Sequence, residues 1–391
     1  MASVCFYFHV HQPLRLRRYS VFETEADYFD EQANREILRK VAEKCYLPAN
    51  ACILDLIKKH EGRFRVAYSV TGVVLDQFEQ WAPEVLESFQ ALAATGCVEF
   101  VCETYYHSLA FLYSRTEFRD QVELQRRRLK ETFDAEPTVF RNTELIYNNE
   151  LAGVAAELGF LSVLCEGADH LLGWRSPNFV YTPPGRPNSR LLLKNYRLSD
   201  DIAFRFGDRS WSSWPLTADR FARWVNQVNG NGFTVNLFMD YETFGEHQWA
   251  DTGIFEFLTH LPGEVLADAD NDFRTPSEVV RNYAAVGEYD VPHLTSWADT
   301  ERDLSAWLGN AMQADAVSAT YRLEEAVKSR GDEALLRDWR RLTTSDHVYY
   351  MSTKYFADGD VHTYFSPYES PYDSYINFMN VLDNLRSRLG L

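Results

Sequence analysis

The stretch SVCFYFHVHQP at residues 3–13 decides the fold of this 391-residue chain. Its first eight residues are mostly apolar or aromatic, which is typical of a strand buried on both faces, and such strands belong to parallel sheets. Comparable short runs recur along the chain, at residues 64–70, 97–103, 138–143, 161–165 and 233–239. Helical stretches separate these runs, and the alternation predicts an α/β fold with a parallel sheet that closes into a barrel.

Helical periodicity fills most of the sequence between the strands. The expected helices lie at residues 35–60 with an interruption at Pro48, 74–95, 116–134, 149–159 and 217–229. After residue 300 the strand signal fades, and further helices are expected at 303–330, 332–343 and 371–389. We therefore expect a barrel domain over residues 1–300 and a helical region over 301–391 packed on it. The proline-rich residues 166–215 are expected to form long loops with short strands, and long loops in compact domains are usually functional.

The charge of the chain narrows the class of partner. It has 39 Lys and Arg against 57 Asp and Glu, a net charge of −18, which repels phosphate backbones and anionic lipids. We expect neither a nucleic acid nor a membrane as partner, because no run approaches the ~20 apolar residues of a membrane span. The N-terminus does not resemble a signal peptide. The six cysteines form no Cys-x-x-Cys pair, so reduced thiols and a cytoplasmic location are expected.

Polar residues follow the predicted strands, at the end where a parallel barrel carries its active site. They are His9 and His11 after the first strand, Glu99, Glu103 and His107 around the third, Arg141 to Glu144 after the fourth, and Asp240, Glu242, Glu246 and His247 after the run at 233–239. A packed apolar core has no use for such side chains. Their shared placement therefore predicts a catalytic site.

Glu144 and Asp240 each end a strand, so both carboxylates are expected at one barrel mouth. Two opposed carboxyl groups are what cleavage of a glycosidic bond requires. One attacks the anomeric carbon or activates water, and the other protonates the leaving oxygen. In an extended chain Glu242 points to the same side as Asp240. It is either a like-charged neighbour that raises the pKa of the acid or a solvated residue.

His9 and His11 also share one face of an extended chain, and two interpretations compete. In metal-dependent amidohydrolase barrels such an H-x-H pair binds zinc, whereas in a carbohydrate enzyme the imidazoles hydrogen-bond sugar hydroxyls. A metal site needs further ligands, usually including a strand-end Lys, which is not convincingly placed here, so the sequence favours sugar binding and no metal. Tryptophans fit an oligosaccharide because sugar C–H faces stack on indoles; they are Trp174, Trp211, Trp214, Trp249, Trp297 and Trp307.

Together these motifs resemble glycoside hydrolase family 57, and within it the α-amylase-like group. Five regions match in order: HVHQP (9–13), GCVEFVCETYYHSLAF (96–111), FRNTELIYNNELA (140–152), FMDYETFGEHQ (238–248) and LTSWADTERDLSAWLGN (294–310). Residues 344–373 also resemble the C-terminal helical part of that group. One departure is that Arg-Asn-Thr precedes Glu144, where many members have an aromatic residue and a proline.

The resemblance implies an incomplete (β/α)7 barrel with a C-terminal helical region, and a retaining enzyme that acts on α-1,4-glucans without a metal or other cofactor. It makes Glu144 the nucleophile and Asp240 the general acid/base, a role for which Asp240 needs a raised pKa. The residues expected to bind substrate are His9, His11, Glu99, His107, Glu242, His247, Trp297, Asp299, Asp346 and His347. A 4-α-glucanotransferase or branching enzyme would use the same carboxylates. A metal-dependent hydrolase and a non-catalytic glucan-binding protein are two further hypotheses that the sequence leaves open.

Overall fold

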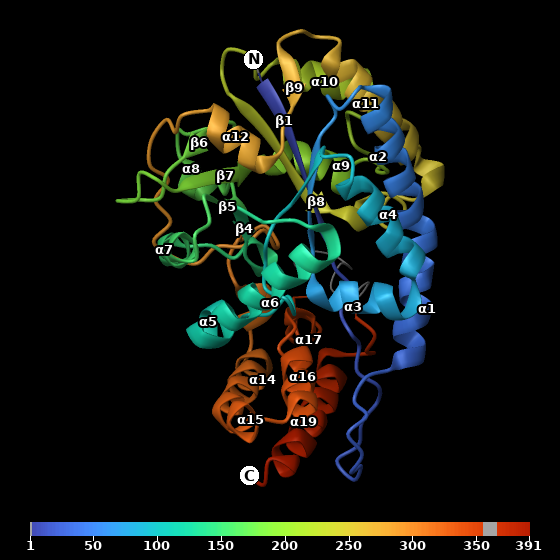
Figure 1. Cartoon of the computed structure of the whole chain (residues 1–391), viewed down its shortest axis with the longest axis vertical. Helices are drawn as coiled ribbons and strands as arrows, with labels where there is room; N and C mark the ends of the chain where they lie inside the picture. Colours follow the sequence, from blue (N-terminus) through green and yellow to red (C-terminus); the bar gives the residue numbers. More distant parts are fainter. Residues whose placement is uncertain (1, 355–365) are drawn as a thin grey trace.

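The computed structural model describes residues 2–354 and 366–391. Residues 355–365, which belong to the motif at 344–373, lie outside the described residues. The strands in chain order are β1 (Ala2–Val10), β2 (Val66–Val70), β3 (Val98–Phe100), β4 (Val139–Arg141), β5 (Ser162–Glu166), β6 (Val180–Tyr181), β7 (Arg190–Lys194), β8 (Thr234–Asp240) and β9 (Asn271–Phe273). Figure 1 shows them at the centre of one half of the molecule, with helices around them.

Strand β1 is the centre of the first sheet, and all nine of its residues are buried. It pairs in parallel with β2 on one side and β8 on the other, β9 pairs with its first residues, and β2 pairs with β3. In the second sheet β4, β5 and β7 are parallel, and β6 is antiparallel to β7. The register aligns His9 with Asp240. The predicted α/β fold with a parallel sheet is confirmed.

Contacts join the two sheets at both edges. A parallel bridge links Cys102, just after β3, to Phe140 of β4. At the other edge the amide N of Asn195 donates to the carbonyl O of Asn236 at 2.9 Å, and the Asn236 side chain donates to the carbonyl O of Leu193 at 2.8 Å. The strands therefore follow one another in the order β1, β2, β3, β4, β5, β7, β8 around a ring of contacts.

The two-residue period of these strands divides their side chains between an inner and an outer face. On β1, Phe6 and Phe8 belong to the large core beneath the surrounding helices. Tyr7 belongs to a separate inner cluster, to which every strand of the ring contributes apolar residues from the strand or from the position directly after it. These inner residues include Tyr7, Ala67, Val101, Val139, Leu164, Leu192 and Phe238.

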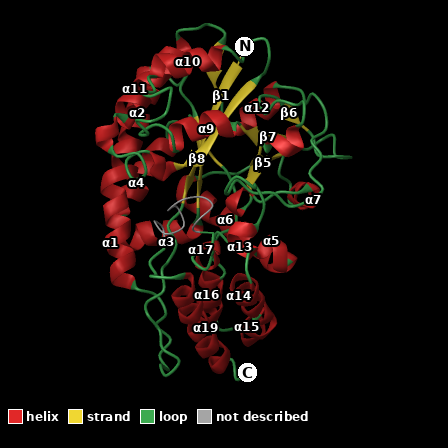
Figure 2. Ribbon diagram, turned by 180° about the vertical axis from the view of Figure 1, so that it is seen from behind, coloured by secondary structure: helices red, strands yellow, loops and turns green. Residues whose placement is uncertain are grey.

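Helices cover the outer face of the strands (Figure 2). They are α1 (Glu31–Val41), α2 (Leu47–Lys59), α3 (Gly72–Trp81), α4 (Pro83–Ala93), α5 (Ala110–Tyr113), α6 (Arg115–Phe133), α7 (Asn149–Glu157), α8 (Asp169–Leu172), α9 (Tyr196–Ala203), α10 (Ala218–Asn226), α11 (Ile254–Leu266) and α12 (Pro276–Asn282). A π-helical turn over Ala42–Tyr46 joins α1 to α2. Pro48 occupies the first turn of α2, where its missing N–H costs no helical bond.

The C-terminal helices form a separate group at one end of the molecule (Figure 1). They are α13 (Ser305–Leu308), α14 (Ala311–Arg322), α15 (Glu324–Arg330), α16 (Glu333–Leu342), α17 (Ser345–Tyr349) and α19 (Pro371–Arg388). Their core contains Trp339 and Leu385, together with Leu14 and Tyr28 from the segment that follows β1. Within the described residues, every helix is too short or too polar to cross a bilayer.

Candidate active site

A layer of polar residues lies next to the inner apolar cluster, on the side of the strands' carboxyl ends. Each member stands two residues beyond an inner apolar residue, so the strand period points it the same way. The seven members are His9, Ser69, Glu103, Arg141, Glu166, Lys194 and Asp240. All but Asp240 are buried. The layer sits where a parallel α/β barrel carries its catalytic residues.

Asp240 is the most accessible carboxylate of this layer, with 43% of its side-chain surface exposed. Its Oδ1 lies 3.3 Å from Nδ1 of His9, the residue aligned with it on β1. The other ring nitrogen of His9 lies 3.4 Å from Oε1 of Glu103. His9 therefore stands between two carboxylates.

Glu144 follows β4 on a short turn over Thr143–Leu145, and both Glu144 and Leu145 have left-handed backbones with φ of 57° and 51°. Such conformations are uncommon outside glycine and cluster at functional sites. Each carboxylate oxygen of Glu144 is held: Oε1 lies 2.9 Å from Nε2 of His107, and Oε2 accepts a hydrogen bond of 2.8 Å from Nε1–H of Trp297. Burial would raise the pKa of Glu144, but the hydrogen bond and charge of His107 lower it.

His107 is engaged by carboxylates at both ring nitrogens, because its Nδ1 lies 3.0 Å from Oε2 of Glu103. Burial would lower its pKa, but the hydrogen bonds to Glu103 and Glu144 raise the pKa to about 9. His107 is therefore an imidazolium at neutral pH. The sequence suggested a contact with sugar, whereas the structure directs this ring to the nucleophile candidate.

The pKa shifts of the two acids at the end of β8 have opposite directions, and that of Asp240 is opposite to expectation. Partial loss of hydration would raise the pKa of Asp240, but the hydrogen bond and the charge of His9 lower it. The expectation of a raised pKa at Asp240 is therefore wrong for the free protein. It is Glu242 whose pKa rises to about 7, through burial first and repulsion by Asp240 second. The Glu242 carboxylate accepts hydrogen bonds from the hydroxyl of Tyr46 and from Nε2 of Gln12.

His11 links the strand layer to the C-terminal helices. Its Nε2 lies 3.0 Å from Oδ2 of Asp346 on α17, and its Nδ1 lies 2.9 Å from the hydroxyl of Thr71. Burial and the charge of His107 lower the pKa of His11 to about 4. The ring is therefore neutral at pH 7, with Nε2–H donating to Asp346 and Nδ1 accepting from Thr71. Its centroid lies 4.3 Å from that of His107.

Trp297 is held beside Glu144 from several directions. Its backbone N–H donates to the carbonyl O of Glu144 at 3.2 Å. The guanidinium of Arg141 and the ammonium of Lys194 lie 5.1 Å and 5.3 Å from its ring centroid. These contacts fix the indole N–H toward the carboxylate.

Three other residues expected to bind substrate, Asp299, His347 and His247, have charged or polar partners of their own near this group of side chains. Asp299 forms an ion pair of 2.7 Å with Lys354. His347 is buried, and its ring nitrogen Nε2 lies 3.2 Å from the carbonyl O of Arg341. Burial lowers the pKa of His247, and the charge of Asp240 opposes that change, which places His247 within electrostatic reach of Asp240.

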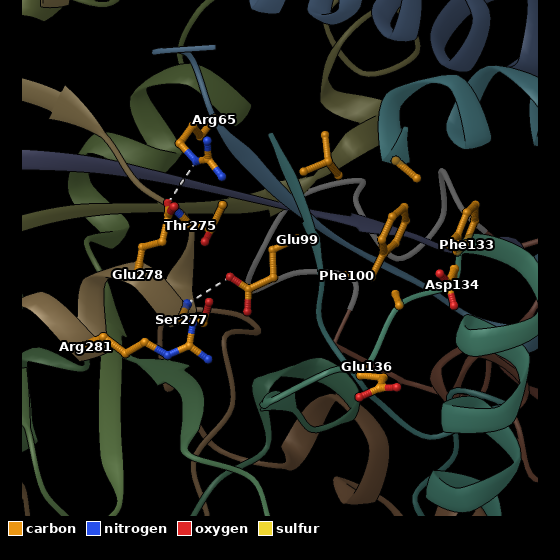
Figure 3. A pocket seen from close by; sticks show the side chains of 13 residues that line it. Arg65, Glu99, Phe100, Phe133, Asp134, Glu136, Thr275, Ser277, Glu278 and Arg281 are labelled. Carbon is orange, nitrogen blue, oxygen red and sulfur yellow. Dashed lines mark hydrogen bonds and ion pairs between the residues drawn. The ribbon is translucent and has the colours of Figure 1, made fainter. Parts of the chain in front are cut away.

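Glu99 is outside the cluster, and its predicted place in the sugar site is wrong. It lies on β3 four residues before Glu103, which is about 13 Å along an extended strand, and the inner residue Val101 stands between them. Figure 3 shows Glu99 directed toward Ser277, whose backbone N–H donates to Oε2 at 2.9 Å. Glu99 and Ser277 line a pocket together with Arg65. This pocket lies at the opposite end of the strands from His9 and Asp240.

The binding-site predictions omitted four charged residues of the layer, which are Glu103, Arg141, Glu166 and Lys194. Glu103 contacts both His9 and His107, and Arg141 lies 3.4 Å from Glu103 through Nη1. Both are fully buried. Their positions in the sequence could have identified them. Each stands two residues beyond an inner apolar residue, as His9 does on β1 and Asp240 does on β8.

Two groups of three side chains among the described residues bring donor atoms close enough to hold a metal ion. They are His9, Glu103 and His107, and His11, His107 and Asp346. Both groups need His107, whose two ring nitrogens already face Glu103 and Glu144. A metal ion bound to His107 would have to displace one of the ring protons that face the carboxylates of Glu103 and Glu144.

Acidic side chains at the carboxyl ends of a ring of parallel strands fit a glycoside-cleaving enzyme. The model of glycosyl hydrolase family 57 matches residues 5–292. A Methanocaldococcus jannaschii protein, provisionally named an alpha-amylase, is 43% identical over 97% of this chain and 83% of its own length. The chain belongs to glycosyl hydrolase family 57, as its motifs predicted.

Solved structures agree with the fold. A GH57 branching enzyme from Thermococcus kodakaraensis superimposes with a TM-score of 0.72 at 15% identity, over 99% of this chain and 90% of that one. The 4-alpha-glucanotransferase of Thermococcus litoralis gives 0.61 at 16% identity, over 90% of this chain. The chain spans about half the length of that glucanotransferase (51%).

Proposed function

We propose that this glycoside hydrolase cleaves α-1,4-linked glucans with retention of configuration, with Glu144 as nucleophile and Asp240 as general acid/base. The observation that carries the proposal is the setting of Glu144, an ionised carboxylate held at both oxygens by His107 and Trp297. It lies in the same cluster of side chains as Asp240, to which His9 and His107 connect it. The name of the M. jannaschii relative supports an α-glucan as substrate.

In the first step Glu144 attacks C1 of the sugar while Asp240 gives its proton to the glycosidic oxygen. In the second step Asp240 removes a proton from water, and the water oxygen displaces Glu144 from C1. This double displacement requires the two carboxyl groups to lie about 5–5.5 Å apart. We expect that separation here.

Asp240 must be protonated to act as an acid, although its pKa is low in the free protein. A sugar bound over its exposed surface would exclude water and so raise its pKa. The neighbouring carboxyl of Glu242 acts in the same direction when it is ionised. We therefore propose that substrate binding raises the pKa of Asp240, so that this residue is protonated when it acts as the acid.

The surrounding side chains are proposed to line the sugar subsites: His11, His247, Trp297, Asp299 and Asp346. For the fold, we infer that the seven strands of the ring and their helices form an incomplete (β/α)7 barrel, with a division from the helical region near residue 300. A cytoplasmic location is proposed, and it fits the six cysteines, which are all free thiols.

The test is turnover of maltopentaose by Glu144→Gln and Asp240→Asn. Each variant should lose most activity, by about 10³-fold or more for removal of a group that acts in the bond-breaking step, and both should keep the thermal unfolding midpoint within a few degrees. Near-normal activity in either variant would remove that residue from its role. Exposed Glu256, on α11, provides a matched control as Glu256→Gln.

The products decide between hydrolysis and transfer, because both reactions use the same two carboxylates. New reducing ends from maltopentaose indicate an amylase. Redistribution of chain lengths without net new ends would indicate a glucanotransferase, and new branch points a branching enzyme. Activity that disappears with a chelator would support a metal-dependent hydrolase instead, and binding of maltodextrin without turnover would indicate a binding protein.

A further inference from the structure

Glu103 lies between the two histidines that contact the proposed catalytic carboxylates. Its Oε1 is 3.4 Å from Nε2 of His9, and its Oε2 is 3.0 Å from Nδ1 of His107. The remaining nitrogen of His9 faces Asp240 at 3.3 Å, and that of His107 faces Glu144 at 2.9 Å. Five ionisable groups thus alternate, carboxylate and imidazole, in one line from acid to nucleophile.

We propose that Glu103 is a positioning residue that fixes the ring orientations of His9 and His107 together and the charge of His107, and so couples the ionisation of Glu144 to that of Asp240. The inference rests on the proposed function, in which these two carboxylates do the chemistry. Glu103 itself has no exposed surface. It therefore acts on the reaction through the imidazoles alone.

Proton counting supports this role. Two carboxylates can share an imidazole without repulsion only when both ring nitrogens carry a proton, and His107 stands between Glu103 and Glu144. Burial would raise the pKa of Glu103, but the charge of His9 and the hydrogen bonds from His107 and His9 hold it well below its usual range. Arg141, whose Nη1 lies 3.4 Å from Oε2 of Glu103, adds a fixed positive charge.

The reaction exchanges charge between the two ends of this line. When Glu144 bonds to C1 and the C1–O bond breaks, Glu144 loses its negative charge; the proton of Asp240 passes to the leaving oxygen, so Asp240 gains one. His107 then faces less negative charge and His9 faces more. Because Glu103 contacts both rings, it keeps His9 and His107 in the same orientation while the charges of the two outer carboxylates change. Hydrolysis of the glycosyl-enzyme reverses the exchange.

The test replaces Glu103 with Gln, which keeps the size and removes the charge. The amide oxygen can accept from only one imidazole. Loss of an opposite charge at this distance lowers a pKa by about 1–3 pH units, so the alkaline limb of kcat/KM, expected near the His107 pKa of about 9, should move down by that amount. The imidazole titration of His107, followed by NMR, should move the same way. Glu103→Asp, which keeps the charge, should recover part of both shifts.

Glu99→Gln is the matched control, because it makes the same change on the same strand at the opposite end of the ring. It should leave the pH profile and the His107 titration unchanged. A purely structural role for Glu103 would lower activity equally at all pH values. Unaltered pH limbs and an unaltered His107 titration in folded Glu103→Gln would overturn the proposal.

Two further outcomes remain decisive. If wild-type protein fails to cleave maltopentaose, the proposed function fails, while the His107 titration still decides the role of Glu103. If Glu103→Gln does not fold, the titration in Glu103→Asp decides: a lowered His107 pKa supports the proposal, and an unchanged value refutes it.

Discussion

The buried carboxyl of Glu242 leads to an unusual expectation, namely that Glu242→Gln stabilises the protein at alkaline pH. A pKa raised from 4.5 to about 7 means that the folded state holds a proton that the unfolded state releases. Stability is therefore lost as pH rises through this window. At about 1.4 kcal/mol for each unit of pKa shift, the free energy of unfolding of the wild type falls by about 3 kcal/mol over this window. A Gln at position 242 does not titrate, so the variant does not undergo this loss.

The assay is urea unfolding of wild type and Glu242→Gln at pH 5 and pH 8, with the difference between the two proteins compared at each pH. The Gln oxygen can still accept from Tyr46 and Gln12, so the packing is kept. The variant should gain about 2–3 kcal/mol relative to wild type between the two pH values. The exposed control Glu256→Gln should gain nothing. A pH-independent difference between wild type and Glu242→Gln would refute the reasoning.

Two other predictions concern the contacts of Glu144 and His11. Trp297→Phe keeps an aromatic ring but removes the N–H that donates to Glu144. Because a hydrogen bond to a charged group contributes about 1.5–3 kcal/mol, kcat/KM on maltopentaose should fall about 10- to 100-fold. An unchanged kcat/KM would show that the indole N–H does not orient the nucleophile. Asp346→Ala leaves the buried Nε2–H of His11 without its acceptor, so the free energy of unfolding, measured by chemical denaturation, should fall by about 1–3 kcal/mol. Asp346→Asn keeps an acceptor oxygen and should restore most of this loss. Equal losses in both variants would contradict that explanation.

The carboxylates that end strands were found from the sequence because strand and barrel geometry are regular. An apolar run such as that before Asp240 marks a strand, and the first polar side chain beyond it faces the carboxyl end of the sheet. The same regularity, applied to exact positions, would have exposed the error at Glu99. Its side chain is on the correct face but four residues too early, beyond Val101 at the other end of the inner cluster.

The roles of the histidines could not be predicted in this way. The spacing of His9 and His11 indicates one shared face, yet His9 meets two carboxylates and His11 meets a hydroxyl and Asp346, which is 335 residues away in the chain. The pKa order of Asp240 and Glu242 was likewise hidden, because it depends on which of the two contacts His9 and which is buried beside Tyr46.

The sequence by itself determined the alternation of strands and helices, the family and the two candidate catalytic carboxylates, since these follow from local periodicity and from motifs contiguous in the chain. Only the tertiary structure decided that His107 is charged, that Glu103 joins both halves of the site, and that α17 completes it through Asp346. The physical reason is that charge and hydrogen bonding depend on distances of about 3 Å between residues, most of which the chain separates by tens to hundreds of positions.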